Sequence, residues 1–559
     1  MFEENRQPEP ISKRLKVKRI NWKKLSGRLI FLAFLIVLTS HSNPDKEKNS
    51  FNPLYNVSEL RDNLYQRVSS LPKASDQSSN DIKVQLNALV HDFFRTAEYN
   101  PVWTDNLGTN EQFRNFLNLL DSSGYYGFPI DYFDNKKIKS LRTEYNSTQS
   151  LSTRVELETL TTYSALKLML YLNKGIVEKD TIATSFEYLR TLPEVLHNAL
   201  KQNLIKDGFL SVQPDLLQFK KIVNSLPNFI DLQLSIKYTT PKFIDDRLLA
   251  KGLYYAGITG TAELDTNENN AKALFKLQEQ YNLRKDSILN KETHKILVSL
   301  LQYRYYQMCL NLNRLRALQN TDEDFLFVNI PEFRLHVIES SQEKETFNVI
   351  VGKTDTPTPI FSSSIEKVVT NPYWTVPKSI VNNEMIQRIR KDSTYLERNG
   401  YFVIDCREEV VDASLIDWTS DDPLGNRYFI RQQNSTSNAL GLVKFIFPND
   451  HGVYLHDTPS RGLFRLKNRT FSHGCIRLEN PDKLAQYLTD KYFIQDSIDI
   501  KGLISTQQNN EIYLNQKVKI HIQYITCSGN DNSEIEFYTD IYNRDGKEIN
   551  SYFLDQKGL

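Results

Sequence analysis

The segment VYLHDTPSRGLFRLKNRTFSHGCIRLEN, from Val453 to Asn480, gathers residues whose types and spacing could do chemistry. A cysteine acts as a nucleophile when a base takes its proton and nearby donors stabilise the oxyanion that it creates. Cys475 stands in the run Ser-His-Gly-Cys, and His456 lies nineteen residues earlier, after the apolar stretch GVYL. Gly474 has no Cβ, so the backbone beside the thiol can approach a substrate closely. The segment therefore predicts a nucleophilic thiol with an imidazole base, joined by a strand, a loop and a returning chain.

The neighbours of the thiol can supply the remaining parts of such a site. The backbone N–H groups of His473, Gly474 and Cys475 could point at a developing oxyanion. Arg477, two residues after the thiol, adds a positive charge that favours the thiolate and could hold a carboxylate. A histidine base is usually oriented by a third group. Asp457 or a backbone carbonyl could do this, and the sequence leaves both open.

These residue types also have other interpretations. Cysteine is often a small buried apolar residue, and that interpretation is preferred for Cys309, Cys406 and Cys527. Metal binding is a second alternative, because His451, His456, His473 and Cys475 are all ligand types. His473 and Cys475 are only two residues apart, and no fourth ligand is paired with them at the usual spacing. We therefore expect no metal and no cofactor.

Composition limits the class of protein. The chain has 559 residues, enough for about three or four domains. Its 69 Lys and Arg nearly cancel 68 Asp and Glu, which argues against nucleic acid as a partner. The four cysteines are far apart in sequence, which argues against a disulfide framework.

The N-terminus has the pattern of an export signal. Nine Lys and Arg against three Glu occupy the first 28 residues, and ten apolar residues, LIFLAFLIVL, follow. Ten residues span about 15 Å as a helix, about half of a bilayer core. Residues 1–42 are thus predicted as a cleaved signal, with a retained inner-membrane anchor as the alternative. Residues 43–81 are rich in Ser, Asn, Asp and Lys and predict a flexible tether.

The rest of the chain predicts a multidomain α+β protein. Apolar residues at helical spacing predict a helical scaffold over 82–240, and three short helices predict a separate module over 241–300. A linker helix over 301–323 leads to a β-rich domain over 324–503, with an inserted helical cap at about 382–425. Further strands over 504–559 are expected to complete that domain. His336 is expected on the solvent side of its strand, because it alternates with apolar residues.

The residues around Cys475 resemble the signature of the L,D-transpeptidases, the YkuD-type cysteine enzymes of the bacterial cell wall. That signature is a histidine, about fifteen residues, then Ser-His-Gly-Cys and a nearby arginine. Here fifteen residues separate His456 from Ser472, and Arg477 follows the thiol. The segments at 350–380, NALGLVKFIFPND and FYTDIYNRDG are similar to the large periplasmic subgroup, which carries a scaffold, a peptidoglycan-binding-like module and a cap. The resemblance covers roughly residues 90–555, and ALFKLQEQYNLRKDSILNKETHKIL is similar to the three-helix peptidoglycan-binding module.

The resemblance implies a role for each site residue. Cys475 would be the nucleophile and His456 the proton acceptor and donor. The backbone from His473 to Cys475, supported by Ser472, would form the oxyanion hole. Tyr454 and Arg477 would shape the substrate pocket.

The resemblance also implies a reaction and its partners. The thiol would attack the third residue of a peptidoglycan tetrapeptide stem, release D-Ala and pass the acyl group to the amine of an acceptor stem. The product would be a 3→3 cross-link made in the periplasm by an enzyme that carbapenems inactivate. Three alternatives remain: an L,D-carboxypeptidase or related stem hydrolase, an enzyme that attaches an outer-membrane protein to the wall, and a non-catalytic wall-binding scaffold.

Overall fold

A computed structural model of the protein describes residues 56–71, 81–128, 133–176, 189–261, 267–318, 324–493 and 498–554. All of these except Asn106–Gly108 belong to one compact unit. The predicted signal segment, residues 1–42, lies outside the described residues. Within the described ranges, no helix is both long enough and apolar enough to cross a membrane.

Helix α2 (Val57–Ser69) corrects the predicted tether over residues 43–81. Its apolar residues are few, but Leu60, Leu64 and Val68 recur every four residues and are completely buried. That spacing places them on one face of a helix. Asn56 caps the helix, because its side chain accepts a hydrogen bond from the backbone N–H of Glu59 at 2.7 Å. The low apolar content of this segment therefore did not indicate that part of it forms a packed amphipathic helix.

The helices of the scaffold surround α6, which is buried along most of its length. Gly175 ends α6 with a φ of +80°, a conformation that glycine adopts without strain. The elements are α3 (Ile82–Thr96), β1 (Thr104–Asp105), β2 (Gly108–Thr109), α4 (Glu111–Asp121), η3 (Ser123–Tyr126), α5 (Asn135–Thr148), α6 (Leu151–Lys174), α8 (Thr191–Lys201), α9 (Ile205–Ser211) and α10 (Leu217–Tyr238).

The next module contains α11, α12 and a long helix, α13, that joins it to the β-rich domain. The predicted third helix and the predicted linker helix are one continuous element, since α13 runs without a break through residue 300. A single helix makes a stiffer connection than two would. The elements are η5 (Pro241–Phe243), α11 (Asp246–Tyr255), α12 (Asn267–Gln280) and α13 (Lys291–Arg316).

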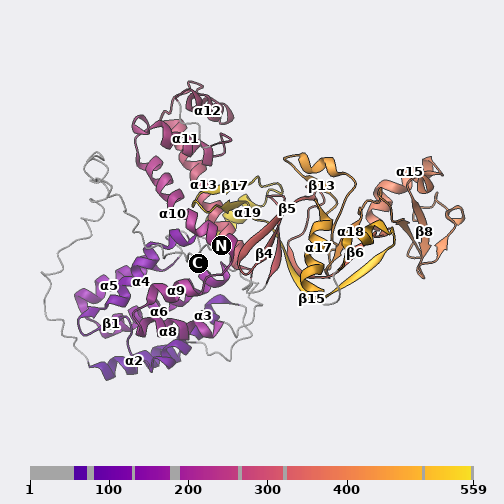
Figure 1. Ribbon diagram of the computed structural model, residues 1–559. Helices are drawn as coiled ribbons and strands as arrows, with labels where there is room; N and C mark the ends of the chain where they lie inside the picture. Colours follow the sequence, from indigo (N-terminus) through magenta and orange to yellow (C-terminus); the bar gives the residue numbers. More distant parts are fainter. Residues whose placement is uncertain are drawn as a thin grey trace, which may run out of the picture. The chain divides into compact units, whose positions relative to one another are not determined.

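A nine-stranded mixed sheet forms the β-rich domain, with α17 (Pro481–Tyr492) and α18 (Ile500–Ser505) packed on one face (Figure 1). The strands lie in the order β13-β5-β14-β12-β11-β6-β15-β3-β4. Their bounds are β3 (Phe325–Asn329), β4 (Arg334–Glu339), β5 (Gln342–Gly352), β6 (Phe361–Thr370), β11 (Val443–Ile446), β12 (Leu455–His456), β13 (Thr470–Ser472), β14 (Ile476–Leu478) and β15 (Asn510–Gln523). The short helix η8 (Arg461–Arg465) lies between β12 and β13 in sequence. The predicted α+β class is confirmed.

The insert between β6 and β11 contains more β-structure than the predicted helical cap. Its four strands pair in the order β7-β10-β8-β9, and its helices share a small apolar core with them. The segment from Tyr428 to Gln432 belongs to this small sheet and pairs with Tyr401–Asp405. The elements are β7 (Trp374–Thr375), α14 (Lys378–Ile380), η6 (Val381–Met385), α15 (Ile386–Lys391), α16 (Tyr395–Arg398), β8 (Tyr401–Asp405), β9 (Val410–Val411), η7 (Ala413–Leu415) and β10 (Tyr428–Gln432).

The C-terminal segment only partly completes the main sheet, in contrast to the prediction for 504–559. Strand β15 joins the sheet, but β16 (Cys527–Gly529) and β17 (Ile535–Phe537) form a separate pair. That pair packs with α10 and α13 in one apolar cluster. Gly529 lies so close to α10 that a Cβ there would come within 2.1 Å of the carbonyl oxygen of Lys221. The chain ends with α19 (Asp545–Ile549) and η9 (Asn550–Leu554).

Candidate active site

Strand pairing brings the predicted residues to one face of the main sheet. Strands β12 and β14 run parallel, with Leu455 opposite Ile476 and His456 opposite Arg477. Leu455 and Ile476 are completely buried in the core beneath the sheet. Side chains alternate between the two faces of a strand, so the residues next to them project to the opposite face. That face carries Tyr454, His456, Cys475 and Arg477.

The turn before the thiol is held by Ser472. Its hydroxyl accepts a hydrogen bond from the backbone N–H of Gly474 at 3.1 Å and donates to the carbonyl of Cys475 at 2.5 Å. Gly474 has a φ of +109°, which strains any residue with a Cβ. Among the described residues, no hydrogen bond uses the backbone N–H of Cys475. This N–H is therefore available to an oxyanion.

The imidazole of His456 is buried and neutral. Its exposed fraction is 4%, and its Nδ1 has no hydrogen-bond partner among the described residues. Burial lowers the pKa of His456 to about 3, helped by the positive charges of Arg477 and Lys444. Backbone hydrogen bonds with Asp457 and Leu440 act in the opposite direction. The ring can therefore accept a proton over the whole physiological pH range.

The carboxylate of Asp457 has other partners than the histidine ring. One oxygen accepts from the backbone N–H of Leu442 at 2.9 Å, and the other pairs with Arg461 at 2.8 Å. Gly441 packs directly against this carboxylate, where a Cβ would come within 2.4 Å of it. Asp457 thus holds the chain beside β12, and the polar groups that reach the ring of His456 are backbone groups.

The thiol of Cys475 is less acidic than the sequence suggested. Burial raises its pKa above the ordinary value. A hydrogen bond from Tyr454 and the charges of Lys444 and Arg477 lower the pKa, but burial outweighs them. The charge of Arg477 favours the thiolate, as the sequence predicted, but burial keeps the thiol neutral. The resting pair is a neutral thiol and a neutral imidazole.

Lys444 is a site residue that the sequence did not reveal. It lies opposite His456 on β11, so both side chains occupy the same face. Its Nζ lies 3.8 Å from the centroid of the Tyr454 ring, a close cation–π contact. Burial lowers its pKa, while the nearby thiol of Cys475 raises it. Among the described residues no carboxylate forms an ion pair with Lys444 or Arg477, and the Nε of Arg477 is buried without a partner.

The insert also reaches this face. Nε2 of His473 lies 2.7 Å from a carboxylate oxygen of Glu384, which belongs to η6. Trp374, at the start of the insert, forms a side-chain hydrogen bond with Tyr454. The insert therefore contacts both the turn before Cys475 and the aromatic ring beside it.

The other three cysteines and His336 lie elsewhere. Cys309 in α13 and Cys527 in β16 are buried, whereas Cys406 is exposed just after β8. The described part of the chain contains no group of three or more His, Cys, Asp or Glu that could hold a metal ion. His336 is buried between Glu332 at 3.0 Å and Glu343 at 2.8 Å, which corrects its predicted solvent-facing position. The two carboxylates raise its pKa to about 9 against the effect of burial.

The fold and the site define a protein with a thiol–imidazole pair on the open face of a mixed β-sheet. Comparison with known proteins agrees with this class. Residues 323–502 match the family model of the L,D-transpeptidase catalytic domain, YkuD, and residues 88–226 match that of the Scaffold domain. The β-rich part of the chain is therefore similar to the YkuD-type L,D-transpeptidase catalytic domain, and the helical part before it is similar to the Scaffold domain.

The similar proteins include a curated relative and a solved structure. A Haemophilus influenzae protein named "Putative L,D-transpeptidase" is 37% identical over 183 residues, 33% of this chain and 37% of that protein's length. The crystal structure of Mycobacterium tuberculosis L,D-transpeptidase 1 is 16% identical and covers 37% of this chain and 63% of that one, with a TM-score of 0.15.

Proposed function

We propose that this protein is an L,D-transpeptidase that forms 3→3 cross-links between peptidoglycan stems through a thioester on Cys475. The observation that carries the proposal is the shared sheet face, where the thiol lies with a buried, neutral His456 and an unused backbone N–H. These are the three parts that acyl transfer through a thiol requires.

The acylation half of the reaction follows from these groups. The sulfur of Cys475 attacks the carbonyl of the third stem residue while Nδ1 of His456 takes the thiol proton. The backbone N–H of Cys475 donates to the oxyanion of the tetrahedral intermediate. The bond to D-Ala then breaks, and the imidazolium returns its proton to the departing amine. A thioester on Cys475 and free D-Ala result.

The second half of the reaction reverses the proton transfers. The side-chain amine of an acceptor stem attacks the thioester, and His456 takes the proton that this amine loses. The thiolate leaves and is protonated, which restores the neutral pair. Water in place of the amine would give a tripeptide, so the hydrolase alternative differs only in the acceptor.

The charges around the thiol support a diacid such as diaminopimelate as the third stem residue. Lys444 and Arg477 lie on the same face as Cys475, and neither has a carboxylate partner among the described residues. A substrate carboxylate would neutralise them. The N-terminal signal pattern supports a periplasmic location and, if retained, an inner-membrane association.

The proposal is tested by incubating the purified chain with disaccharide-tetrapeptide and analysing the products by mass spectrometry. A cross-linked dimer that has lost one D-Ala is expected, and Cys475→Ala should abolish it. Cys406→Ala is the matched control, because that thiol is exposed and remote in sequence from the site. Tripeptide alone would favour the hydrolase, and no change in the substrate would refute both the cross-linking enzyme and the hydrolase.

A further inference from the structure

The loop after β5 forms hydrogen bonds with the turn that carries the thiol. The carbonyl of Ser472 accepts hydrogen bonds from the backbone N–H of Lys353 at 2.9 Å and the hydroxyl of Thr356 at 3.2 Å. The hydroxyl of Thr358 donates to the carbonyl of Gly474 at 2.8 Å and accepts from the backbone N–H of Gly352 at 2.9 Å. Both carbonyl oxygens, those of Ser472 and Gly474, belong to the chain just before Cys475.

Thr358 controls the peptide that supplies the oxyanion donor. The C=O of Gly474 and the N–H of Cys475 belong to the same peptide group. A trans peptide is planar and directs these two groups to opposite sides, so fixing the carbonyl fixes the direction of the N–H. Thr358 is only 3% exposed, so water does not easily replace its hydroxyl.

Tyr542, far away in sequence, closes the loop that holds Thr358. Its hydroxyl donates to the carbonyl of Gly352 at 2.7 Å and accepts from the backbone N–H of Thr358 at 3.2 Å. Gly352 lies so close to the returning loop that a Cβ there would come within 2.1 Å of the carbonyl oxygen of Thr356. The hydroxyl of Tyr542 therefore bonds to both ends of the tight loop from Gly352 to Thr358.

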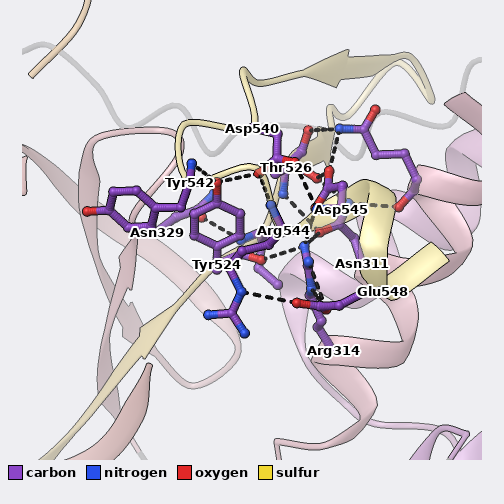
Figure 2. A network of polar contacts seen from close by, with 12 residues as sticks. Asn311, Arg314, Asn329, Tyr524, Thr526, Asp540, Tyr542, Arg544, Asp545 and Glu548 are labelled. Carbon is purple, nitrogen blue, oxygen red and sulfur yellow. Dashed lines mark hydrogen bonds and ion pairs between the residues drawn. The ribbon is translucent and has the colours of Figure 1, made fainter. Parts of the chain in front are cut away.

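Figure 2 shows how Tyr542 is itself held. Its ring stacks on that of Tyr524, with centroids 5.5 Å apart, and its backbone N–H donates to the Tyr524 hydroxyl at 2.8 Å. That hydroxyl donates to Asp540 at 2.6 Å. The guanidinium groups of Arg314 and Arg544 lie 5.4 and 5.5 Å from the centroid of the Tyr524 ring.

Asp545 fastens this network to helix α13 (Figure 2). It is completely buried, and its carboxylate accepts from Gln307 at 3.0 Å and Thr526 at 2.6 Å and pairs with Arg314 at 2.8 Å. Its backbone N–H donates to the second oxygen of Asp540 at 2.8 Å. A continuous set of hydrogen bonds thus runs from α13 through the C-terminal segment to Gly474.

We propose that Thr358 and Tyr542 are positioning residues that aim the backbone N–H of Cys475 at the oxyanion, with the segment 540–549 anchoring them to α13. This inference rests on the proposed acyl transfer. The anchoring segment lies beyond residues 323–502, so the match to the catalytic domain does not include it.

The test compares two reactions of the same thiol in the full chain. Acylation by a carbapenem passes through an oxyanion, whereas alkylation by iodoacetamide does not. Thr358→Val should lower the ratio of the acylation rate constant to the alkylation rate constant roughly 10- to 100-fold, since removing a whole oxyanion donor costs about 10²- to 10³-fold. Tyr542→Phe should lower the same ratio, and Thr358→Ser, which keeps a hydroxyl, should restore it.

Matched controls remove comparable hydroxyls elsewhere. Thr489→Val removes a buried hydroxyl that donates only within α17, and Tyr538→Phe removes one that donates to Ser528. Neither should change the ratio. If Thr358→Val and Tyr542→Phe lower both rate constants equally, or neither, the positioning role is wrong although the proposed function stands. If wild type is alkylated at Cys475 but never acylated, the proposed function and this inference both fail.

Discussion

The most informative property of the site is the neutrality of His456 at low pH. An imidazole acts as a base only when it is unprotonated. Because burial lowers the pKa of His456 to about 3, the ring should stay unprotonated well below pH 6. We predict that the rate constant for acylation of Cys475 by a carbapenem hardly changes between pH 7.5 and pH 5.

The size of the contrast follows from the two pKa values. An ordinary histidine with a pKa of about 6.5 would be protonated about 30 to 1 at pH 5, so the rate constant would fall about 30-fold. With a pKa of about 3, only about 1% of His456 would be protonated at that pH. The expected change is therefore smaller than the error of a routine kinetic measurement.

Intact-mass or stopped-flow kinetics across pH 4 to 8 would measure this directly. Arg477→Met is the informative variant, because the positive charge of Arg477 is the second cause of the low pKa after burial. The acid limb of its profile should move to higher pH than that of wild type. A fall of about 30-fold in wild type by pH 5 would refute the buried, neutral base.

Three further predictions concern the surrounding structure. Gly474→Ala should lower acylation on the order of 10²-fold through the strain of its positive φ, whereas Gly462→Ala, where a Cβ meets open space, should not; equal effects would contradict the role of the turn. Glu384→Gln should lower the ratio of cross-linked dimer to tripeptide by up to about 5-fold, the value of a polar contact worth about 1 kcal/mol; an unchanged ratio would exclude Glu384 from holding the insert against the turn before Cys475. His336, whose pKa rises from 6.5 to about 9 on folding, stabilises the folded state below pH 6.5 and loses this effect as the pH rises through 9. Urea unfolding should therefore show that the free energy of unfolding of wild type is lower at pH 10 than at pH 6 by on the order of 3 kcal/mol. His336→Gln should lack this difference. An equal difference in both proteins would contradict the stabilising role of the two carboxylates around His336.

The local parts of the site were predictable from sequence because they are close in the chain. The run from Ser472 to Cys475 forms one turn, and the glycine in it indicates a backbone conformation with a positive φ. His456 ends a short apolar strand, so its place beside the returning strand followed from the spacing. The backbone contacts of the imidazole were left open, since either Asp457 or a carbonyl would have satisfied the same pattern.

The groups that the sequence did not reveal depend on register and tertiary contact. Lys444 faces the thiol only because β11 pairs with β12 in one register, and a shift of one residue would turn it away. Thr358 and Tyr542 are 184 residues apart and meet through a single hydroxyl. The burial of His336 depends on one carboxylate from the turn before β4, Glu332, and one from β5, Glu343, which alternation along one strand cannot indicate.

The most direct test of the central proposal is to trap the acyl group and locate it. The full chain would be mixed with disaccharide-tetrapeptide, quenched in acid and digested, and the peptides mapped by mass spectrometry. A tripeptide-linked thioester on Cys475 in wild type, absent from Cys475→Ala, is the predicted result. An acyl group on another residue, or turnover that persists without the sulfur of Cys475, would contradict it.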